Sequence, residues 1–206
     1  MSAREVILST IRARRTRSEG HPPPWRQPAP SGDSVQHFAD RAGAAAAQVR
    51  RLASAEEIPA CVAEVLRSRN LPAIVHLPPD PVLDGFMWTE GPGLSLARTP
   101  PGPDDAAIAI ALFGIAETGT LVYPASGTRP PSWHFRAGLE IAIIAADSIE
   151  PDLERVLARL KARDILPSTI NLVTGPSRTG DIEQTLELGA HGPKELVILI
   201  VPLGGG

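Results

Sequence analysis

The side chains best suited to bind a ligand lie near the end of the chain, between two apolar runs. The run 170–173 has the pattern of a short strand and is closed by Gly175, after which Ser177, Arg178 and Thr179 follow. An arginine presents a planar fork that matches a carboxylate or a phosphate, and the two neighbouring hydroxyls can add hydrogen bonds. This group therefore predicts a binding site for an anion.

A helix is expected directly after these residues. The pattern from Asp181 to Leu188 is helical, Gly189 ends it, and the run 196–201 has the pattern of a buried strand. In a right-handed crossover of this kind, functional groups lie at the carboxyl end of the first strand. The unpaired N–H groups of the helix N-terminus carry about half a positive charge and would point at the same anion.

Three further residues of this stretch are candidates for the site. Asp181 and Gln184 resemble a capping box, so Asp181 either caps the helix or contributes to the site. Glu183 points away from that cap, and it either lies on a solvated helix face or reaches the ligand. His191, in the turn before the last strand, is included among the ligand-binding candidates.

A second group of candidates interrupts the apolar middle of the chain. Glu117, Thr118, Gly119 and Thr120 follow an apolar stretch that has the pattern of sheet core. Glu117 either acts as an acid, base, nucleophile or ligand clamp, or it only accepts hydrogen bonds from nearby backbone at a strand end. Gly119 would let another backbone or a ligand come close. We expect Glu117 and Arg178 to open onto a common hollow.

The segment 126–136 has the composition of a polar, proline-rich loop and is expected to form a rim or lid. His134 and Arg136 could reach a cleft from this loop, although a lone histidine on a loop is usually exposed. The strand expected next, at 139–145, carries Glu140 near its start.

The composition limits the class of protein. The chain has 206 residues, a formal net charge of −3, 43% hydrophobic and 21% charged residues, which is typical of a soluble domain and argues against a nucleic-acid groove. Its single cysteine, Cys61, excludes an internal disulfide and a cysteine-ligated cluster within the chain, and the scattered histidines form no metal motif. The longest apolar run is too short to span a bilayer. We therefore expect a cytoplasmic protein without a membrane span, a metal site or a cofactor of its own.

Three segments are expected along the chain. Residues 1–19 form an N-terminal helix with a basic end, residues 20–33 form a proline-rich linker, and residues 34–206 form an α/β domain. Within the domain, helices and strands alternate, which predicts a three-layer α/β/α fold with a largely parallel sheet. The helices are expected at 34–42, 54–66 and 148–160 and the strands at 73–77, 94–98, 106–111 and 139–145, whereas 45–52 could be either.

Two blocks of the sequence resemble the signatures of a known family. GIAETGT at 114–120 and TGPSRTGDIEQTLELGAHGPKEL at 174–196 resemble the lactate-utilization, or LUD, domain, and the chain is similar to this family along most of its length after the linker. The resemblance implies a fold like that of glucosamine-phosphate isomerase, ribose-phosphate isomerase and the CoA-transferases. It also implies a role in oxidising L-lactate to pyruvate, as one subunit beside two partner proteins, at least one of which carries iron–sulfur clusters. Gly180 stands where the family more often has alanine, and the segment around Trp133 departs from the usual pattern.

Three functions are kept as hypotheses. The first is a non-redox subunit of an L-lactate oxidation system, which binds an anionic ligand or a partner at the Arg178 loop, with Glu117 opposite, and works with iron–sulfur partner proteins. The second is an enzyme similar to a CoA-transferase or an isomerase, with Glu117 as nucleophile or base, and it depends on fold kinship alone. The third is a pure assembly protein whose loops face a subunit interface.

Overall fold

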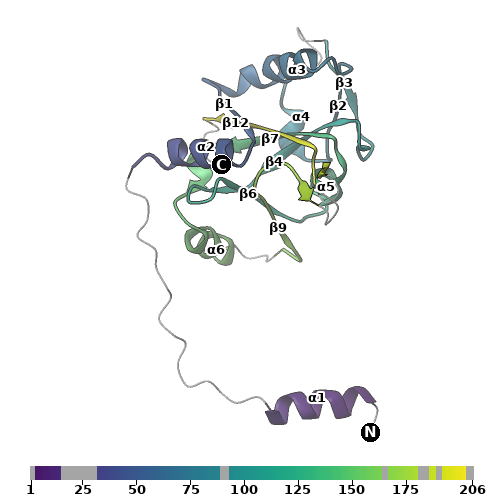
Figure 1. The fold of residues 1–206 in the computed structure, drawn as a ribbon, viewed down its shortest axis with the longest axis vertical. Helices are drawn as coiled ribbons and strands as arrows, with labels where there is room; N and C mark the ends of the chain where they lie inside the picture. Colours follow the sequence, from purple (N-terminus) through teal and green to yellow (C-terminus); the bar gives the residue numbers. More distant parts are fainter. Residues whose placement is uncertain are drawn as a thin grey trace.

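A six-stranded, fully parallel sheet forms the centre of the molecule (Figure 1). The computed structural model describes residues 3–14, 32–88, 93–163, 167–180, 186–188 and 192–202. In spatial order, the strands of this sheet are β1 (Gln48–Arg51), β12 (Glu195–Val201), β7 (Leu139–Ala145), β4 (Ala106–Ala111), β2 (Ile74–His76) and β3 (Ser95–Ala97). The middle strands β12, β7 and β4 are buried on both faces, which explains why they are continuous apolar runs. The five strands predicted in this sheet are confirmed to within one residue at each end, and the ambiguous segment 45–52 contains β1.

A smaller sheet lies beside the parallel one. Its strands, in spatial order, are β8 (Ile149–Glu150), β5 (Phe113–Ile115), β6 (Thr120–Pro124) and β9 (Ile170–Val173). β5 and β6 form an antiparallel hairpin, and β9 pairs antiparallel with β6. The strand predicted at 170–173 is confirmed, but it belongs to this sheet and not to the sheet that contains β12.

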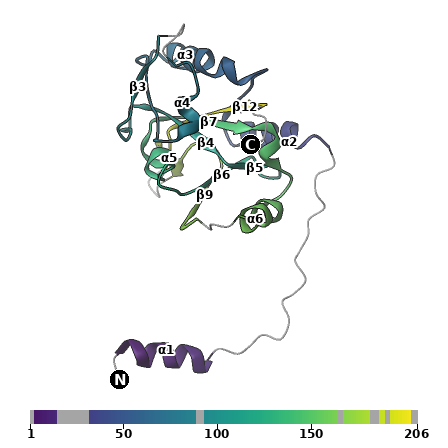
Figure 2. The same cartoon turned by 180° about the vertical axis from the view of Figure 1, so that it is seen from behind.

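Helices cover both sides of the molecule. α3 (Ile58–Ser68) and the short α4 (Pro81–Asp84) pack on one face of the parallel sheet. The opposite face is covered by α2 (Ser34–Ala44) and by the small sheet, whose outer side carries α6 (Leu153–Lys161). Figures 1 and 2 show α3 and α6 at opposite ends of this stack. The predicted α/β/α architecture is confirmed, with the small sheet inserted between the parallel sheet and α6.

The remaining elements are short or lie apart from the sheets. α5 (Ser132–Arg136) packs on β4 through Trp133 and Ala107, η1 (Ala55–Glu57) leads into α3, and η2 (Ala146–Ser148) follows β7. α1 (Ala3–Arg14) lies within the predicted helical segment 1–19, and most of the predicted linker lies outside the described residues. Among the helices that the structure describes, none combines the length and the apolar character needed to cross a membrane.

The segment after β9 differs from the predicted crossover. β10 (Arg178–Gly180) pairs antiparallel with β11 (Leu186–Leu188), so the predicted helix is wrong at 186–188, and residues 181–185 lie outside the described part of the chain. A helix of this length is marginal in isolation, and alternating side chains such as Leu186 and Leu188 suit a strand equally well. Because 178–180 is a strand, an anion at Arg178 has no adjoining helix N-terminus in the described backbone.

Candidate functional site

The two sequence motifs meet along the β6–β9 pair. Thr120 begins β6, Thr174 directly follows β9, and their Oγ1 atoms lie 2.6 Å apart. Thr118 Oγ1 lies 2.6 Å from the Oγ1 of Thr120, so the three hydroxyls form one hydrogen-bonded chain. Antiparallel strand pairing therefore joins two motifs that are 54 residues apart in the sequence.

Two glycines of the motifs allow α2 to pack closely against them. Gly119 and Gly175 have φ angles of 69° and 75°, a region that favours glycine. A Cβ atom on Gly119 would overlap the backbone of Ala42, and one on Gly175 would overlap the carbonyl oxygen of Ala45. Gly119 thus makes room for another backbone, which was one of its two predicted roles, and Gly175 does the same.

Glu117 lies in the turn between β5 and β6. Its backbone N–H donates to the carbonyl oxygen of Pro151 at 3.1 Å, and its side chain is only partly buried. The apolar stretch reverses at this point as a hairpin, so the carboxylate lies at a chain reversal and not inside the sheet core. The predicted hollow shared by Glu117 and Arg178 stays a prediction, because the Arg178 side chain is outside the described part of the structure.

A pocket with a volume of about 180 Å³ lies beside the second motif. Its lining residues come from α5, the end of β9, the loop that follows it and the segment before β12: Phe135, Leu172, Val173, Thr174, Gly175, Pro176, Ser177, Gly192 and Pro193. The Ser177 N–H donates to the carbonyl oxygen of Pro193 at 2.9 Å, which fixes the loop just before Arg178. Of the predicted ligand-binding residues, the structure brings Gly175 and Ser177 into this pocket. Asp181, Glu183 and His191 lie outside the described residues, and so do the side chains of Arg178 and Thr179.

A buried polar cluster joins β6, α5 and β7. Glu140 on β7 accepts a hydrogen bond from the Tyr123 hydroxyl at 2.7 Å, and His134 Nδ1 lies 3.4 Å from the same carboxylate oxygen. The rings of Tyr123 and His134 stack with centroids 3.8 Å apart. Burial, and secondarily the Glu140 charge, raises the pKa of Tyr123 well above its ordinary value, so the hydroxyl stays a donor.

The sequence left two roles open for His134, a residue that reaches a cleft or an exposed loop residue. Only 3% of it is accessible to solvent, so the exposed alternative is wrong. One signal was available in the sequence, because a carboxylate within the apolar strand at 139–145 needs a polar partner from a facing layer.

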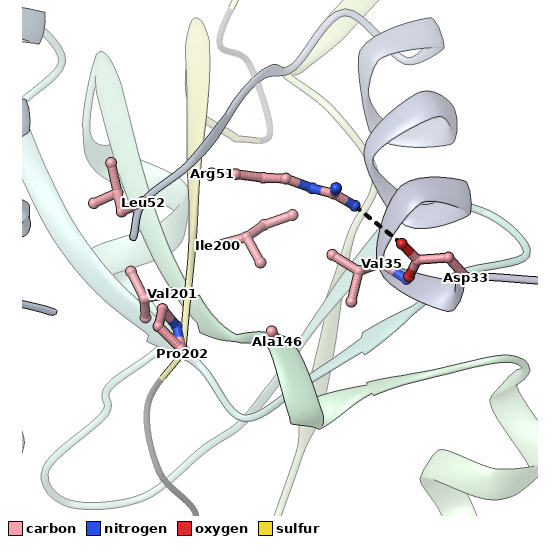
Figure 3. A pocket seen from close by; sticks show the side chains of 8 residues that line it. All are labelled: Asp33, Val35, Arg51, Leu52, Ala146, Ile200, Val201 and Pro202. Carbon is pink, nitrogen blue, oxygen red and sulfur yellow. Dashed lines mark hydrogen bonds and ion pairs between the residues drawn. The ribbon is translucent and has the colours of Figure 1, made fainter. Parts of the chain in front are cut away.

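A second pocket, of about 290 Å³, lies at the carboxyl edge of the parallel sheet (Figure 3). Leu52, Val201 and Pro202 line it at the ends of β1 and β12, and Asp33 and Arg51 form an ion pair of 3.8 Å at its side. Ligands of open parallel sheets commonly bind at this edge. No predicted site residue lines this pocket.

The described residues offer neither a group of metal ligands nor a reactive thiol. Within the described ranges, no group of three or more histidine, cysteine, aspartate or glutamate side chains could hold a metal ion. Burial raises the pKa of the Cys61 thiol, which favours the unreactive protonated form.

Residues 104–201 match the LUD domain family. Lactate utilization protein C of Geobacillus thermodenitrificans is 32% identical over 101 residues, which cover 47% of this chain and 42% of that protein. Lactate utilization protein C of Macrococcus caseolyticus is 30% identical over 122 residues, which cover 57% and 52% of the two chains. The matching segment thus spans about half the length of these curated relatives.

A solved structure with a similar fold is that of a DUF162 family protein from Deinococcus radiodurans. The similarity has a TM-score of 0.56 at 17% sequence identity and covers 82% of this chain and 96% of that chain. At this identity the match supports the fold alone. Residues 104–201 thus match the LUD domain family, and the fold of the chain is similar to that of this solved structure.

Proposed function

We propose that this chain is a non-redox subunit of a system that oxidises L-lactate to pyruvate, and that it binds a small anionic ligand beside the Arg178 hairpin. The observation that carries the proposal is the match of residues 104–201 to the LUD domain family, together with the similarity of the chain to proteins named for lactate utilization. Removal of two electrons from lactate requires an acceptor. A chain with one cysteine cannot supply the four thiolates of a typical iron–sulfur cluster, so the electrons pass to iron–sulfur partner proteins.

The ligand site of this proposal is the pocket at the second motif. Its volume of about 180 Å³ is below the range of about 300–1,000 Å³ that holds drug-sized molecules, which favours a small acid over a nucleotide. Thr174 and Ser177 line the pocket, and Arg178 directly follows Ser177 in the sequence. The guanidinium group of an arginine can pair with the carboxylate of a ligand.

The N-terminal helix is the proposed contact with a partner subunit. α1 exposes 48% of Val6, 59% of Ile7 and 59% of Ile11, and the last two lie one helical turn apart. The first 17 residues contain five arginines and one glutamate. An apolar stripe with a basic flank fits an apolar groove that is rimmed by acidic side chains.

Two experiments test the proposal. Inactivation of the gene in its host should abolish growth on L-lactate as sole carbon source and leave growth on glucose intact, with rescue by the full chain. Normal growth on L-lactate without the gene would overturn the assignment to lactate oxidation.

The ligand site is tested by calorimetric titration of L-lactate and pyruvate into the full-length protein. Arg178→Ala should weaken binding by about tenfold or more, as expected for loss of a charged hydrogen bond. The matched control is Arg67→Ala, an exposed arginine on α3, which should bind like the wild type. Equal binding by all three proteins would remove Arg178 from the site.

A further inference from the structure

The chain of hydroxyls that joins the two motifs leads from the pocket of about 180 Å³ to an exposed residue outside it. It consists of Thr118, Thr120 and Thr174, and neighbouring Oγ1 atoms are 2.6 Å apart at both steps. Thr174 lines the pocket, whereas Thr118 and Thr120 do not. Thr120 is only 5% exposed, and Thr118, at the other end of the hydroxyl chain, is exposed to solvent. The pocket therefore shares a hydrogen-bond network with a surface residue.

The hydrogen bonds of the hydroxyl chain can run in two directions. Each hydroxyl has one proton to donate and two lone pairs that accept. In one direction, Thr118 donates to Thr120 and Thr120 donates to Thr174, which leaves the Thr174 proton for a ligand in the pocket. In the opposite direction, Thr174 donates to Thr120 and Thr120 donates to Thr118, so Thr174 presents only lone pairs to the ligand. Either oxygen can be the donor in both 2.6 Å contacts.

Both directions satisfy the buried member of the hydroxyl chain. Thr120 accepts one hydrogen bond and donates one in each of them, so its buried hydroxyl is never unpaired. Thr118 is exposed, so water completes its hydrogen bonds in either case. Because Thr120 has a single proton, the direction of one hydrogen bond fixes that of the other. A ligand that contacts Thr174 therefore selects the direction of the whole hydroxyl chain.

We propose that Thr174 binds the oxygen at C2 of a small acid, and that the hydroxyl chain reverses to accommodate either a 2-hydroxy acid or a 2-keto acid. The hydroxyl of L-lactate donates to Thr174, whereas the keto oxygen of pyruvate accepts from it. The carboxylate of either acid pairs with Arg178, as in the proposed function on which this inference rests. Thr118 and Thr120 are positioning residues, because they act on the ligand only through Thr174. One pocket thereby holds both the reactant and the product of the proposed reaction.

The test measures the affinity for L-lactate relative to pyruvate by calorimetric titration of the full-length protein. In Thr118→Val, the Thr120 proton has only Thr174 as its acceptor within the hydroxyl chain, so Thr174 is held as a donor to the pocket. This direction suits a keto oxygen and opposes a donating hydroxyl, so the affinity for L-lactate relative to pyruvate should fall by about threefold to tenfold. Thr99→Val, also at an exposed position, is the matched control and should keep the wild-type ratio. An unchanged ratio in Thr118→Val would overturn the inference.

A second comparison separates the hydroxyl of Thr120 from its packing. Thr120→Val replaces the central hydroxyl by a methyl group and interrupts the hydroxyl chain, so it should weaken the binding of both acids by about threefold or more. Thr120→Ser keeps the hydroxyl and should bind both acids to within about twofold of the wild type. Equal losses in the two variants would assign the effect to packing, and wild-type binding by Thr120→Val would remove Thr120 from the network. Either result would contradict the proposed role of the hydroxyl chain.

The failure of this inference is distinguishable from failure of the proposed function. If Arg178→Ala weakens binding but Thr118→Val keeps the wild-type ratio, the ligand site stands and the inference fails. If growth on L-lactate does not need the gene but the ratio changes in Thr118→Val, the role in lactate oxidation fails and the inference stands. If the wild type binds neither acid, the ligand site and the inference both fail.

Discussion

Tyr123→Phe tests the energetics of the buried cluster, because it removes one hydroxyl and keeps the ring. The Tyr123 hydroxyl donates to Glu140 at 2.7 Å, and both residues are buried. A hydrogen bond to a charged group contributes about 1.5–3 kcal/mol to stability. For a domain of this size, each kcal/mol changes the Tm by about 2–4 °C, so we expect a decrease of about 3–12 °C.

The assay is thermal unfolding of wild type, Tyr123→Phe, Glu140→Gln and the double variant. The hydroxyl stabilises the protein mainly through the carboxylate, so its removal should cost less once Glu140 is an amide. We expect the two single changes to be non-additive by about 1 kcal/mol. Additive effects would show that the hydroxyl acts on another group.

Tyr123→Phe should also change how the stability of the protein depends on alkaline pH. Burial raises the pKa of Tyr123 well above its ordinary value of 10.0, so the folded protein retains this proton where the unfolded chain loses it. The stabilisation is complete below pH about 10 and decreases above it by about 1.4 kcal/mol per pH unit. Tyr123 is the only tyrosine in the chain, so only the wild type should show this additional alkaline slope.

Two outcomes would refute this account of the cluster. A Tm of Tyr123→Phe within about 1 °C of the wild type would show that the 2.7 Å contact contributes little to stability. Parallel alkaline unfolding curves for the two proteins would show that Tyr123 has no raised pKa.

The remaining predictions concern packing and assembly. Gly119→Ala should lower the free energy of unfolding by more than about 2 kcal/mol in urea titrations, because a Cβ there overlaps the α2 backbone at a positive φ. Gly127→Ala, with no atom within 4 Å of its Cβ, should change it by less than about 0.5 kcal/mol, and equal effects would contradict the packing role. Replacing Ile7 and Ile11 by aspartate in the full chain should abolish co-purification with the proposed partner subunits without lowering the Tm. Retention of the complex would exclude α1 as the contact.

The sequence predicted the elements whose own residue pattern shows which of their faces are buried. β7 and β12 are enclosed on both faces, so each is a continuous apolar run that is visible without tertiary information. α3 buries a face that repeats at helical spacing and was predicted for the same reason. At 186–188 two leucines fit either a helix or a strand, and pairing with 178–180 decides between them.

The site was harder to predict, because the neighbours of its residues come from elements that are distant in the sequence. His134 belongs to a proline-rich segment that suggests an exposed loop, yet Trp133 anchors α5 on β4 and the Tyr123 ring covers the imidazole. The sequence indicated that Gly119 meets another backbone or a ligand. Only the fold shows that this neighbour is Ala42 of α2, which lies far earlier in the chain.

The packing of α2 also shows that the segment matched to the LUD family depends on residues before it. The match begins at residue 104, but β4 within it is flanked by β2, and β12 within it is flanked by β1. Both motif glycines rest on the C-terminal end of α2, and Phe38 of the same helix is fully buried in the core beneath the small sheet. Without α2, β1 and β2, two long apolar strands would expose their edges and the left-handed backbone at Gly119 and Gly175 would lose the surface that fixes it. The geometry of the site therefore depends on a folding unit that includes α2 and β1 as well as the two motifs.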